Sequence, residues 1–177
     1  MRKIRIAIVG VGNCASSLVQ GINFYDGSSV NSTGIGLMHR QIGSYRPDDI
    51  EIVAAFDIDR RKVGQDISKA IFSPPNCTKI FRDKIQRTGA IVKMGCVFDS
   101  FAEHMRDQDP LRTFLPLEKE STREQIIEEL RDSAAEMLVN YLPVGSEQAT
   151  RFYASCALEA GLGFVNNIPV FIASDPV

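Results

Sequence analysis

Residues 4–15 read Ile4-Arg5-Ile6-Ala7-Ile8-Val9-Gly10-Val11-Gly12-Asn13-Cys14-Ala15, and this stretch decides the fold. Its apolar, largely β-branched first half stops at Gly10, which is typical of a strand buried on both faces in a parallel sheet. After the glycines, apolar residues recur at spacings of three and four as far as Ile22, which predicts an amphipathic helix ending at about Phe24. The chain therefore opens with a buried strand, a glycine turn and a helix.

The glycine turn matches the pattern G-x-G-x-x-G/A at Gly10, Gly12 and Ala15. In that pattern the first glycine permits a tight turn, and the second lets the backbone approach a pyrophosphate. The third position allows the helix to pack closely on the strand. The exposed N–H groups at the start of the helix would then receive a diphosphate. The alternative is a glycine-rich turn that binds no ligand.

An acidic residue at the end of the second strand completes this type of site by bonding the ribose hydroxyls. The apolar run 51–56 ends at Asp57, which has that position although it lies farther along the chain than usual. The Gly-, Ser- and Asn-rich stretch 25–49 explains the distance if it is an inserted loop. A carboxylate there would repel a 2′-phosphate, which favours NAD over NADP. The alternative role of Asp57 is helix capping, which Asp59 can perform instead.

The rest of the chain alternates between strand and helix patterns, with residues 99–119 unassigned. We expect a helix from Asp59 to Ile71, a strand within 90–97, a helix capped by a Ser121–Glu124 capping box, a strand at 136–142, a helix at 146–160 closed by Gly161, and a strand at 163–167. This order predicts one α/β domain over residues 1–177, a doubly wound parallel sheet of the Rossmann-like, dinucleotide-binding class. We interpret the basic run 60–62 as a solvated helix face.

The composition limits the classes of partner. With 44% apolar and 24% charged residues, the chain has the composition of a folded protein. Its formal net charge of −2 gives no global positive field, so we expect no nucleic-acid partner. No apolar run approaches the roughly 20 residues that span a bilayer. The four cysteines and two histidines show no metal-binding spacing, and the widely spaced cysteines fit a reducing cytoplasm. We therefore expect a cytoplasmic protein with no membrane contact and no metal-binding residues in this chain, and the sequence leaves open whether the protein requires a metal or monovalent ion.

Two later loops lie where open α/β sheets bind their ligands, outside the carboxyl ends of strands. Residues 141–143 could face the nicotinamide half of a cofactor, and Asn167 ends the last expected strand. On spacing alone, an ordinary strand-to-helix turn with Ser146 as N-cap is favoured over ligand contact. Tyr153 on the next helix could lean over the cofactor, although buried packing is the favoured interpretation.

The glycine motif is shared by many dehydrogenases, but here it occurs together with four more specific segments. They are Gly36-Leu37-Met38-His39, Ala54-Ala55-Phe56-Asp57, Asn140-Tyr141-Leu142-Pro143-Val144-Gly145-Ser146-Glu147 and Phe164-Val165-Asn166-Asn167-Ile168-Pro169-Val170-Phe171-Ile172-Ala173-Ser174. With residues 9–18, these segments resemble the prokaryotic branch of myo-inositol-1-phosphate synthase nearly from end to end.

The resemblance implies an NAD-dependent isomerase of inositol and phospholipid biosynthesis. Such an enzyme converts glucose 6-phosphate into inositol 1-phosphate by internal oxidation, aldol cyclisation and reduction, and works as a homo-oligomer, a tetramer in this family. The resemblance also implies cofactor contacts at Gly10, Val11, Gly12, Asn13, Cys14, Asp57, Tyr141, Leu142, Pro143 and Asn167 and, from the actinobacterial-type members, at Asp66 and Tyr153.

Enzymes of this family are much longer than the present chain and hold their catalytic lysines and aspartates in the part that has no counterpart here. We therefore expect NAD binding without turnover by these 177 residues, with a catalytic and oligomerisation domain beyond residue 177. The alternatives are another NAD-dependent oxidoreductase with the same domain and a non-catalytic NAD-binding module. We also expect the inserted loop 25–49 to contribute to a subunit contact.

Overall fold

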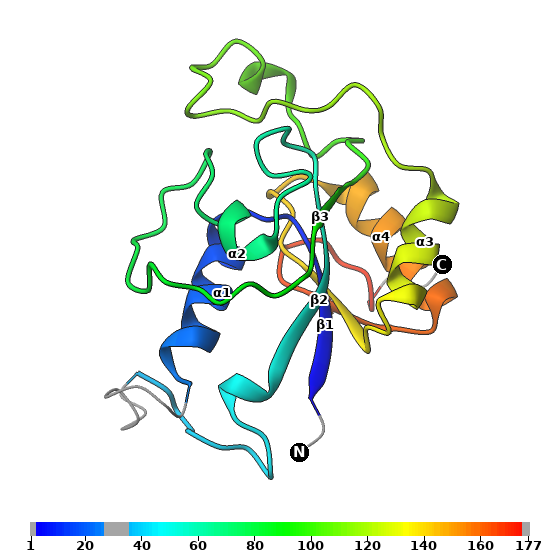
Figure 1. Ribbon diagram of the computed structural model, residues 1–177. Coiled ribbons are helices and arrows are strands. Elements are labelled where there is room, and N and C mark those ends of the chain that lie inside the picture. The colour runs from blue at the N-terminus through cyan, green and yellow to red at the C-terminus, as the bar shows by residue number, and fades with distance from the viewer. Residues whose placement is uncertain (1–2, 27–35, 175–177) are drawn as a thin grey trace.

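The structure is a computed structural model and describes residues 3–26 and 36–174 (Figure 1). Its sheet has five parallel strands in the order β3-β2-β1-β4-β5. The elements are β1 (Ile4–Val9), α1 (Asn13–Phe24), the 3₁₀ helix η1 (Pro47–Asp49), β2 (Ile50–Asp57), α2 (Ile67–Ala70), β3 (Val92–Met94), the 3₁₀ helix η2 (Glu103–Met105), α3 (Arg123–Asp132), β4 (Met137–Asn140), α4 (Glu147–Ala160) and β5 (Gly163–Asn166). This strand order is that of the Rossmann fold, so the expected doubly wound α/β class is confirmed.

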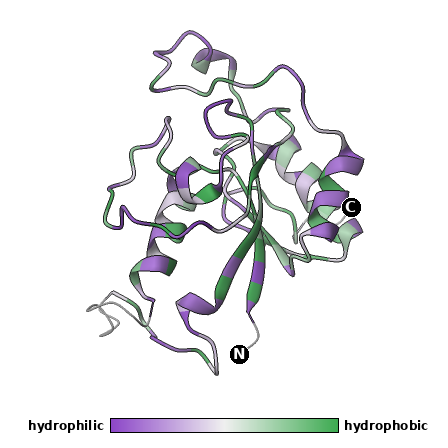
Figure 2. Cartoon of the chain, viewed as in Figure 1, coloured by the Kyte–Doolittle hydropathy of each residue, from purple (hydrophilic) through white to green (hydrophobic). Residues whose placement is uncertain are grey.

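Helices cover both faces of the sheet, α1 and α2 on one side and α3 and α4 on the other (Figure 1). Alternate residues of β1 face these two layers. Ala7 and Val9 belong to the core under α3 and α4, whereas Ile6 and Ile8 belong to the core under α1 and α2. Figure 2 shows the resulting hydrophobic strands between helices with hydrophilic outer faces. The run 4–9 is apolar at nearly every position because both of its faces are buried.

The helix expected from Asp59 to Ile71 is wrong in extent. Asp59 forms an isolated bridge with Pro116, residues 60–64 form turns, and only the short helix α2 follows them. Gly64 has a φ of +86°, and its N–H donates to the Val92 carbonyl of β3 at 2.8 Å. The backbone leaves the helical conformation there in order to pair with the sheet edge, and Asp66 becomes the N-cap of α2.

The capping box of α3 lies one residue later than expected. Thr122 is the N-cap, and its Oγ1 accepts the Gln125 N–H at 3.3 Å while Gln125 Oε1 accepts the Thr122 N–H at 2.9 Å. The expected Ser121–Glu124 box is therefore wrong. Both registers offer the same capping chemistry, and a tertiary contact decides between them, because the Ser121 hydroxyl donates to the Met94 carbonyl of β3 at 2.6 Å.

The later elements lie within the expected ranges. Strands β3, β4 and β5 are shorter than their sequence patterns, and α4 ends at Gly161 in the left-handed conformation (φ +82°). The unassigned segment 99–119 is irregular apart from η2. In the described part of the chain, no helix is both long and apolar enough to cross a membrane.

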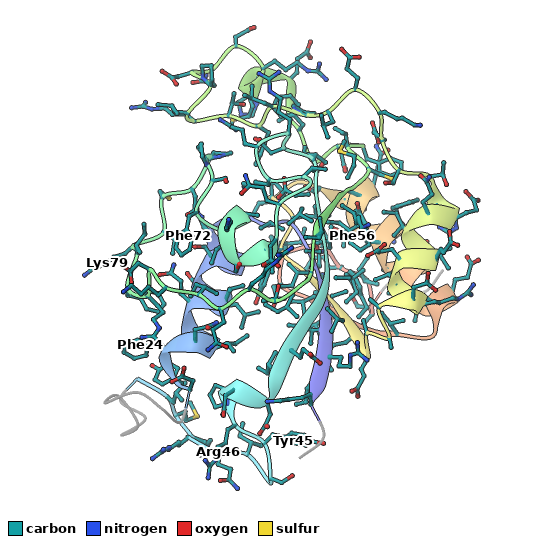
Figure 3. The ribbon with its side chains drawn as sticks, in the orientation of Figure 1. Phe24, Tyr45, Arg46, Phe56, Phe72 and Lys79 are labelled. Carbon is teal, nitrogen blue, oxygen red and sulfur yellow. The ribbon has the colours of Figure 1, made fainter. Side chains whose placement is uncertain are left out.

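The stretch 25–49, for which the sequence predicts an inserted loop, lies between α1 and β2, and its residues 27–35 lie outside the described ones. The described part contains an isolated bridge between Ile42 and Tyr45 and ends in η1. Figure 3 places Tyr45 and Arg46 near the amino ends of β1 and β2. They are thus remote from the carboxyl ends of the strands, where ligands of such sheets bind. The subunit contact expected for the insertion stays a prediction.

Candidate cofactor-binding site

A cavity of about 610 Å³ opens at the carboxyl ends of the strands. Its volume is within the range of ordinary ligand pockets, about 300–1,000 Å³. The glycine turn after β1, Asp57 at the end of β2 and the loop 141–144 after β4 all contribute to its wall. Residues 75–77 and parts of the long connection between β3 and α3 complete the lining.

The two glycines of the turn have different roles. Gly10 has a φ of +89°, and a Cβ there would lie 2.5 Å from the Tyr141 carbonyl oxygen. Gly10 is therefore required by the fold itself. Gly12 has a φ of −102°, and a Cβ there would meet no protein atom within 4 Å. Since the space beside Gly12 belongs to the cavity, this glycine leaves room for a ligand rather than for the protein.

The start of α1 is open toward the cavity. Gly12 occupies the N-cap position without a side-chain hydrogen bond, and among the described residues no side chain accepts from the first-turn N–H groups of Asn13, Cys14 and Ala15. The start of α4 is different, because the Asp99 carboxylate accepts its N–H groups at Gln148 (2.8 Å) and Ala149 (3.0 Å). The positive end of the α1 dipole and the backbone donors of Asn13 and Cys14, which line the cavity, are thus available to an anion.

Asp57 lines the cavity with its carboxylate held on two sides. Its Oδ2 accepts the Val11 N–H at 2.7 Å, and its Oδ1 accepts the Asp59 N–H at 2.8 Å. Each carboxylate oxygen can accept more than one hydrogen bond, so both retain capacity for a ligand hydroxyl. The side chain is only 6% exposed, and such a bond would therefore form in a largely desolvated position.

The basic run 60–62 is not the solvated face that the sequence suggested. Lys62 is fully buried with its Nζ 3.9 Å from Asp57 Oδ2, and this ammonium has no hydrogen-bond partner among residues 3–26 and 36–174. Burial lowers the pKa of Lys62, and the Asp57 carboxylate opposes that shift. Arg61 pairs with Asp59, whose Oδ2 lies 2.5 Å from a guanidinium nitrogen. Two acidic and two basic side chains therefore balance one another where β2 ends.

Asn140 links the two loops at the other end of the cavity. It is fully buried, its Oδ1 accepts the Leu142 N–H at 3.1 Å, and its Nδ2 donates to Thr150 Oγ1 at 3.2 Å and to Asn166 Oδ1 at 2.9 Å. Its backbone carbonyl accepts from the Asn167 side chain at 3.3 Å. Asn140 therefore fixes both the loop after β4 and the loop after β5, and all its polar groups are satisfied.

Tyr153 lines the cavity but is only 1% exposed. Its hydroxyl accepts the Cys96 N–H at 2.9 Å, and its ring lies 6.2 Å from that of Phe56, centroid to centroid. Burial raises the pKa of Tyr153, so the phenol is neutral at physiological pH. Gly95 is needed beside it, because a Cβ there would collide with the hydroxyl. The packing role of Tyr153 is confirmed, and its contact with a cofactor stays a prediction.

The cavity collects most of the residues that were expected to bind a cofactor. Ten of the twelve line it: Gly10, Gly12, Asn13, Cys14, Asp57, Tyr141, Leu142, Pro143, Tyr153 and Asn167. Val11 and Asp66 do not. Val11 is buried and acts through its backbone N–H, which orients the carboxylate of Asp57.

Asp66 has a structural role away from the cavity lining. Its carboxylate accepts the N–H groups of Ser68 (3.0 Å), Thr88 (3.3 Å) and Gly89 (2.8 Å), which join α2 to the segment before β3. Burial opposes ionisation of this carboxyl, but the hydrogen bonds outweigh burial and lower the pKa of Asp66 to about 2. These bonds explain the residue without a cofactor contact.

Two further loops line the cavity, and neither was expected from the sequence. In the first, Asn13 Oδ1 accepts the Cys77 N–H at 2.9 Å and the Asn13 carbonyl accepts from Thr78 Oγ1 at 3.0 Å, so the loop 75–78 is fixed to the glycine turn. The second loop contributes Leu111, Arg112 and Phe114. Neither loop has a sequence pattern that indicates ligand binding. Residues 73–76 only mark the end of a helix, and residues 99–119 have no periodic pattern of apolar residues. The described residues contain no group of three or more His, Cys, Asp or Glu side chains that could hold a metal ion.

The chain resembles several known proteins over nearly its whole length. Over 175 residues, 99% of its length, it is 46% identical to the inositol-3-phosphate synthases of Mycolicibacterium smegmatis and Mycobacterium tuberculosis. Over 173 residues it is 46% identical to the inositol-3-phosphate synthase of Corynebacterium glutamicum. Over nearly its whole length, the chain is thus similar to inositol-3-phosphate synthases. It spans about half the length of these relatives, 46% of each. No model in a collection of protein-family models matches it.

Two solved structures resemble the chain in fold. The crystal structure of Ari2 matches 98% of the chain with a TM-score of 0.79 at 31% identity, and the chain covers 48% of Ari2. A myo-inositol-1-phosphate synthase-related protein from Thermotoga maritima matches 98% of the chain, which covers 50% of that protein, with a TM-score of 0.69 at 23% identity. At that identity the second match supports the fold alone.

Proposed function

We propose that this chain binds NAD in the cavity at the carboxyl ends of the strands. We further propose that it is the cofactor-binding part of an enzyme that converts glucose 6-phosphate into inositol 1-phosphate. The observation that carries NAD binding is the free space beside Gly12, where the open first turn of α1 adjoins the cavity. The observation that carries the reaction is the 46% identity to inositol-3-phosphate synthases over nearly the whole chain.

The residues present fit the parts of a dinucleotide in order. The first-turn N–H groups of α1 would hold the diphosphate, because they are backbone donors at the positive end of a helix of 12 residues. Asp57 would accept from the adenosine ribose hydroxyls, and its charge disfavours the 2′-phosphate of NADP. The loop 141–143 and Asn167 would then adjoin the nicotinamide half.

The contribution of this chain to the reaction is positioning. When bound, NAD supplies reversible hydride transfer, which an isomerisation with internal oxidation and reduction uses in both directions without net oxidation. Asn140 holds the loops after β4 and β5 in one arrangement, and hydride transfer needs such fixed geometry. Buried side chains behind the cavity, such as Phe56 and Leu142, keep water away from its base.

The groups for the aldol step must come from elsewhere in the enzyme. Stabilising the oxyanion of a ketone or enolate calls for cations or strong hydrogen-bond donors at the reacting carbonyl. Among the described residues that line the cavity, Arg112 is the only basic side chain, and it extends from the connection between β3 and α3. We therefore propose that these 177 residues bind the cofactor without turning over glucose 6-phosphate.

Two assays test the proposal. A protein of the relatives' length that contains this chain should form inositol phosphate from glucose 6-phosphate with no accumulation of NADH at 340 nm. The isolated 177-residue chain should bind NADH, seen as a change in its fluorescence, and should form no inositol phosphate. Turnover by the isolated chain would contradict the division of roles. If NADH binding saturates but the longer protein does not act on glucose 6-phosphate, the same domain serves a different reaction.

A further inference from the structure

Lys62 is a buried cation that the proposed cofactor contacts do not use. Its side chain is fully buried, and it does not belong to the lining of the cavity. Its Nζ has no hydrogen-bond partner in the part of the chain that the structure describes. Lysine is almost never fully buried unless its charge is paired, because removing an ammonium from water is costly in free energy. The reason for this residue must therefore lie in the charges around it.

The four charges where β2 ends form two separate ion pairs. Arg61 donates from Nε to Asp59 Oδ1 at 2.8 Å, and its other guanidinium nitrogens donate to Asp59 Oδ2 and to two backbone carbonyls of the connection between β3 and α3. The Lys62 ammonium faces the second carboxylate, with its Nζ 3.9 Å from Asp57 Oδ2. Among residues 3–26 and 36–174, no other basic side chain forms an ion pair with Asp57.

The backbone turn 60–64 holds Lys62 in this position. The Lys62 N–H donates to the Asp59 carbonyl at 2.9 Å, and the Gln65 N–H donates to the Lys62 carbonyl at 3.0 Å. Gly64 joins the same turn to the edge strand β3 through its backbone hydrogen bond. The departure from a regular helix, which the sequence did not predict, therefore fixes the backbone that carries this ammonium.

The Asp57 carboxylate lines the cavity, whereas its counter-ion does not. The carboxylate is 6% exposed, and a desolvated carboxyl group favours its neutral form unless an opposite charge or hydrogen bonds stabilise the anion. The N–H groups of Val11 and Asp59 supply two hydrogen bonds, at 2.7 and 2.8 Å, and Lys62 supplies the opposite charge. A distance of 3.9 Å is too long for a hydrogen bond, so the ammonium acts through its charge and leaves acceptor positions of the carboxylate to a ligand.

We propose that Lys62 is a positioning residue that keeps Asp57 charged and oriented as the acceptor of the ribose hydroxyls. This inference rests on the proposed NAD site and adds a residue that the cofactor does not touch. A neutral carboxyl group at position 57 would be a weaker acceptor for those hydroxyls and would repel a 2′-phosphate less. Both the affinity for NAD and the preference for NAD over NADP thus depend on the charge of Lys62.

Lys62→Met tests the role of this charge, because methionine is a long unbranched side chain without one. We expect the 177-residue chain with this substitution to bind NADH about tenfold more weakly, the lower part of the range for a charge-assisted hydrogen bond, and to bind NADPH within about threefold of the unmodified chain. Fluorescence titration measures both affinities. Lys62→Arg, which keeps the positive charge, should bind NADH more tightly than Lys62→Met does. The control is Lys93→Met, which removes the partner of Glu129 in a half-exposed ion pair outside the cavity lining and should leave both affinities unchanged.

A substitution at Asp57 shows whether Lys62 acts through that carboxylate. In the Asp57→Asn background, Lys62→Met should change the NADH affinity by less than about twofold, because the charge that Lys62 stabilises is already absent. Urea unfolding should show the same dependence: each single substitution leaves one buried charge unpaired, so the double variant should be more stable than either single variant. If a single variant fails to fold, folding of the double variant and retention of NADH binding by Lys62→Arg test the pair instead.

Four results would overturn this role of Lys62. Equal weakening of NADH and NADPH by Lys62→Met would mean that the residue has a general structural role. The same loss of NADH affinity in the Asp57→Asn background would mean that Lys62 acts without Asp57. Unchanged NADH affinity in Lys62→Met would leave the ion pair with a structural role only. If the unmodified chain bound no NADH, the proposed NAD site itself would be refuted, and this role of Lys62 with it.

Discussion

Gly12→Ala is the substitution that most cleanly separates ligand binding from folding. The new methyl group would meet no protein atom within 4 Å, and the φ of −102° lies outside the left-handed region that favours glycine. As an N-cap, alanine is somewhat less favourable than glycine, so we expect a stability loss of about 1 kcal/mol or less. The methyl would, however, occupy the space in which a diphosphate must approach the first turn of α1.

The expected loss of affinity follows from that occupied space. Placing a methyl group into a close-packed contact costs about 1–3 kcal/mol, which corresponds to a dissociation constant about 5- to 150-fold higher. Fluorescence titration with NADH gives the affinity, and thermal unfolding gives the stability of each variant.

Gly21→Ala is the matched control, because it adds a methyl within the same helix at a position with equally free space outside the cavity lining. This control should raise the stability of α1 by up to about 1 kcal/mol and leave NADH binding unchanged. If the Gly12→Ala variant bound NADH within twofold of the unmodified chain, the space beside Gly12 would not be the diphosphate site.

Three further predictions concern the described side chains. Asp57→Ala should weaken NAD binding by about 1.5–3 kcal/mol, the value of a charge-assisted hydrogen bond, and should reduce the preference for NAD over NADP. Calorimetric titrations that are unchanged in this variant would mean that another group binds the ribose. Asp66 has a pKa lowered to about 2, so its contribution to stability is complete above about pH 4 and is lost as the pH falls toward 2. Between pH 4 and pH 2, urea unfolding should show a smaller loss of unfolding free energy for Asp66→Asn than for the unmodified chain. Equal losses in the two proteins would disprove this. Asn140→Ala should lower the free energy of unfolding by about 1–3 kcal/mol, because the buried Leu142 N–H loses its acceptor, and it should also weaken NADH binding. If unfolding of this variant is unchanged, other contacts hold the loop after β4.

The fold could be predicted because its signals are local. The buried run 4–9, the glycine turn and the period of α1 lie within 21 consecutive residues, and the doubly wound order follows from alternation of strand and helix patterns. The carboxyl ends of parallel strands meet at one edge, so residues after β1, β2 and β4 could be assigned to one cavity from sequence alone.

The remaining features depend on contacts between distant residues. Arg61 bonds carbonyls about 50 positions away at Pro110 and Thr113, and Asp99 caps α4 from the connection before α3. No rule based on sequence spacing predicts such pairs. The basic run 60–62 looked like a solvated face because periodicity cannot show that Lys62 is buried beside Asp57. The long helix expected after Asp59 failed for the same reason, since pairing with β3 outweighs helix propensity.

The central claim, that this chain binds NAD through its glycine turn, is tested most directly by titrating NAD into the isotopically labelled 177-residue chain and following backbone amide signals by NMR. We expect saturable shifts, with one NAD per chain, that are largest at Gly12, Asn13, Cys14 and Ala15 and extend to Asp57. Absence of any saturable shift, or saturable shifts confined to residues outside the cavity, would contradict that claim.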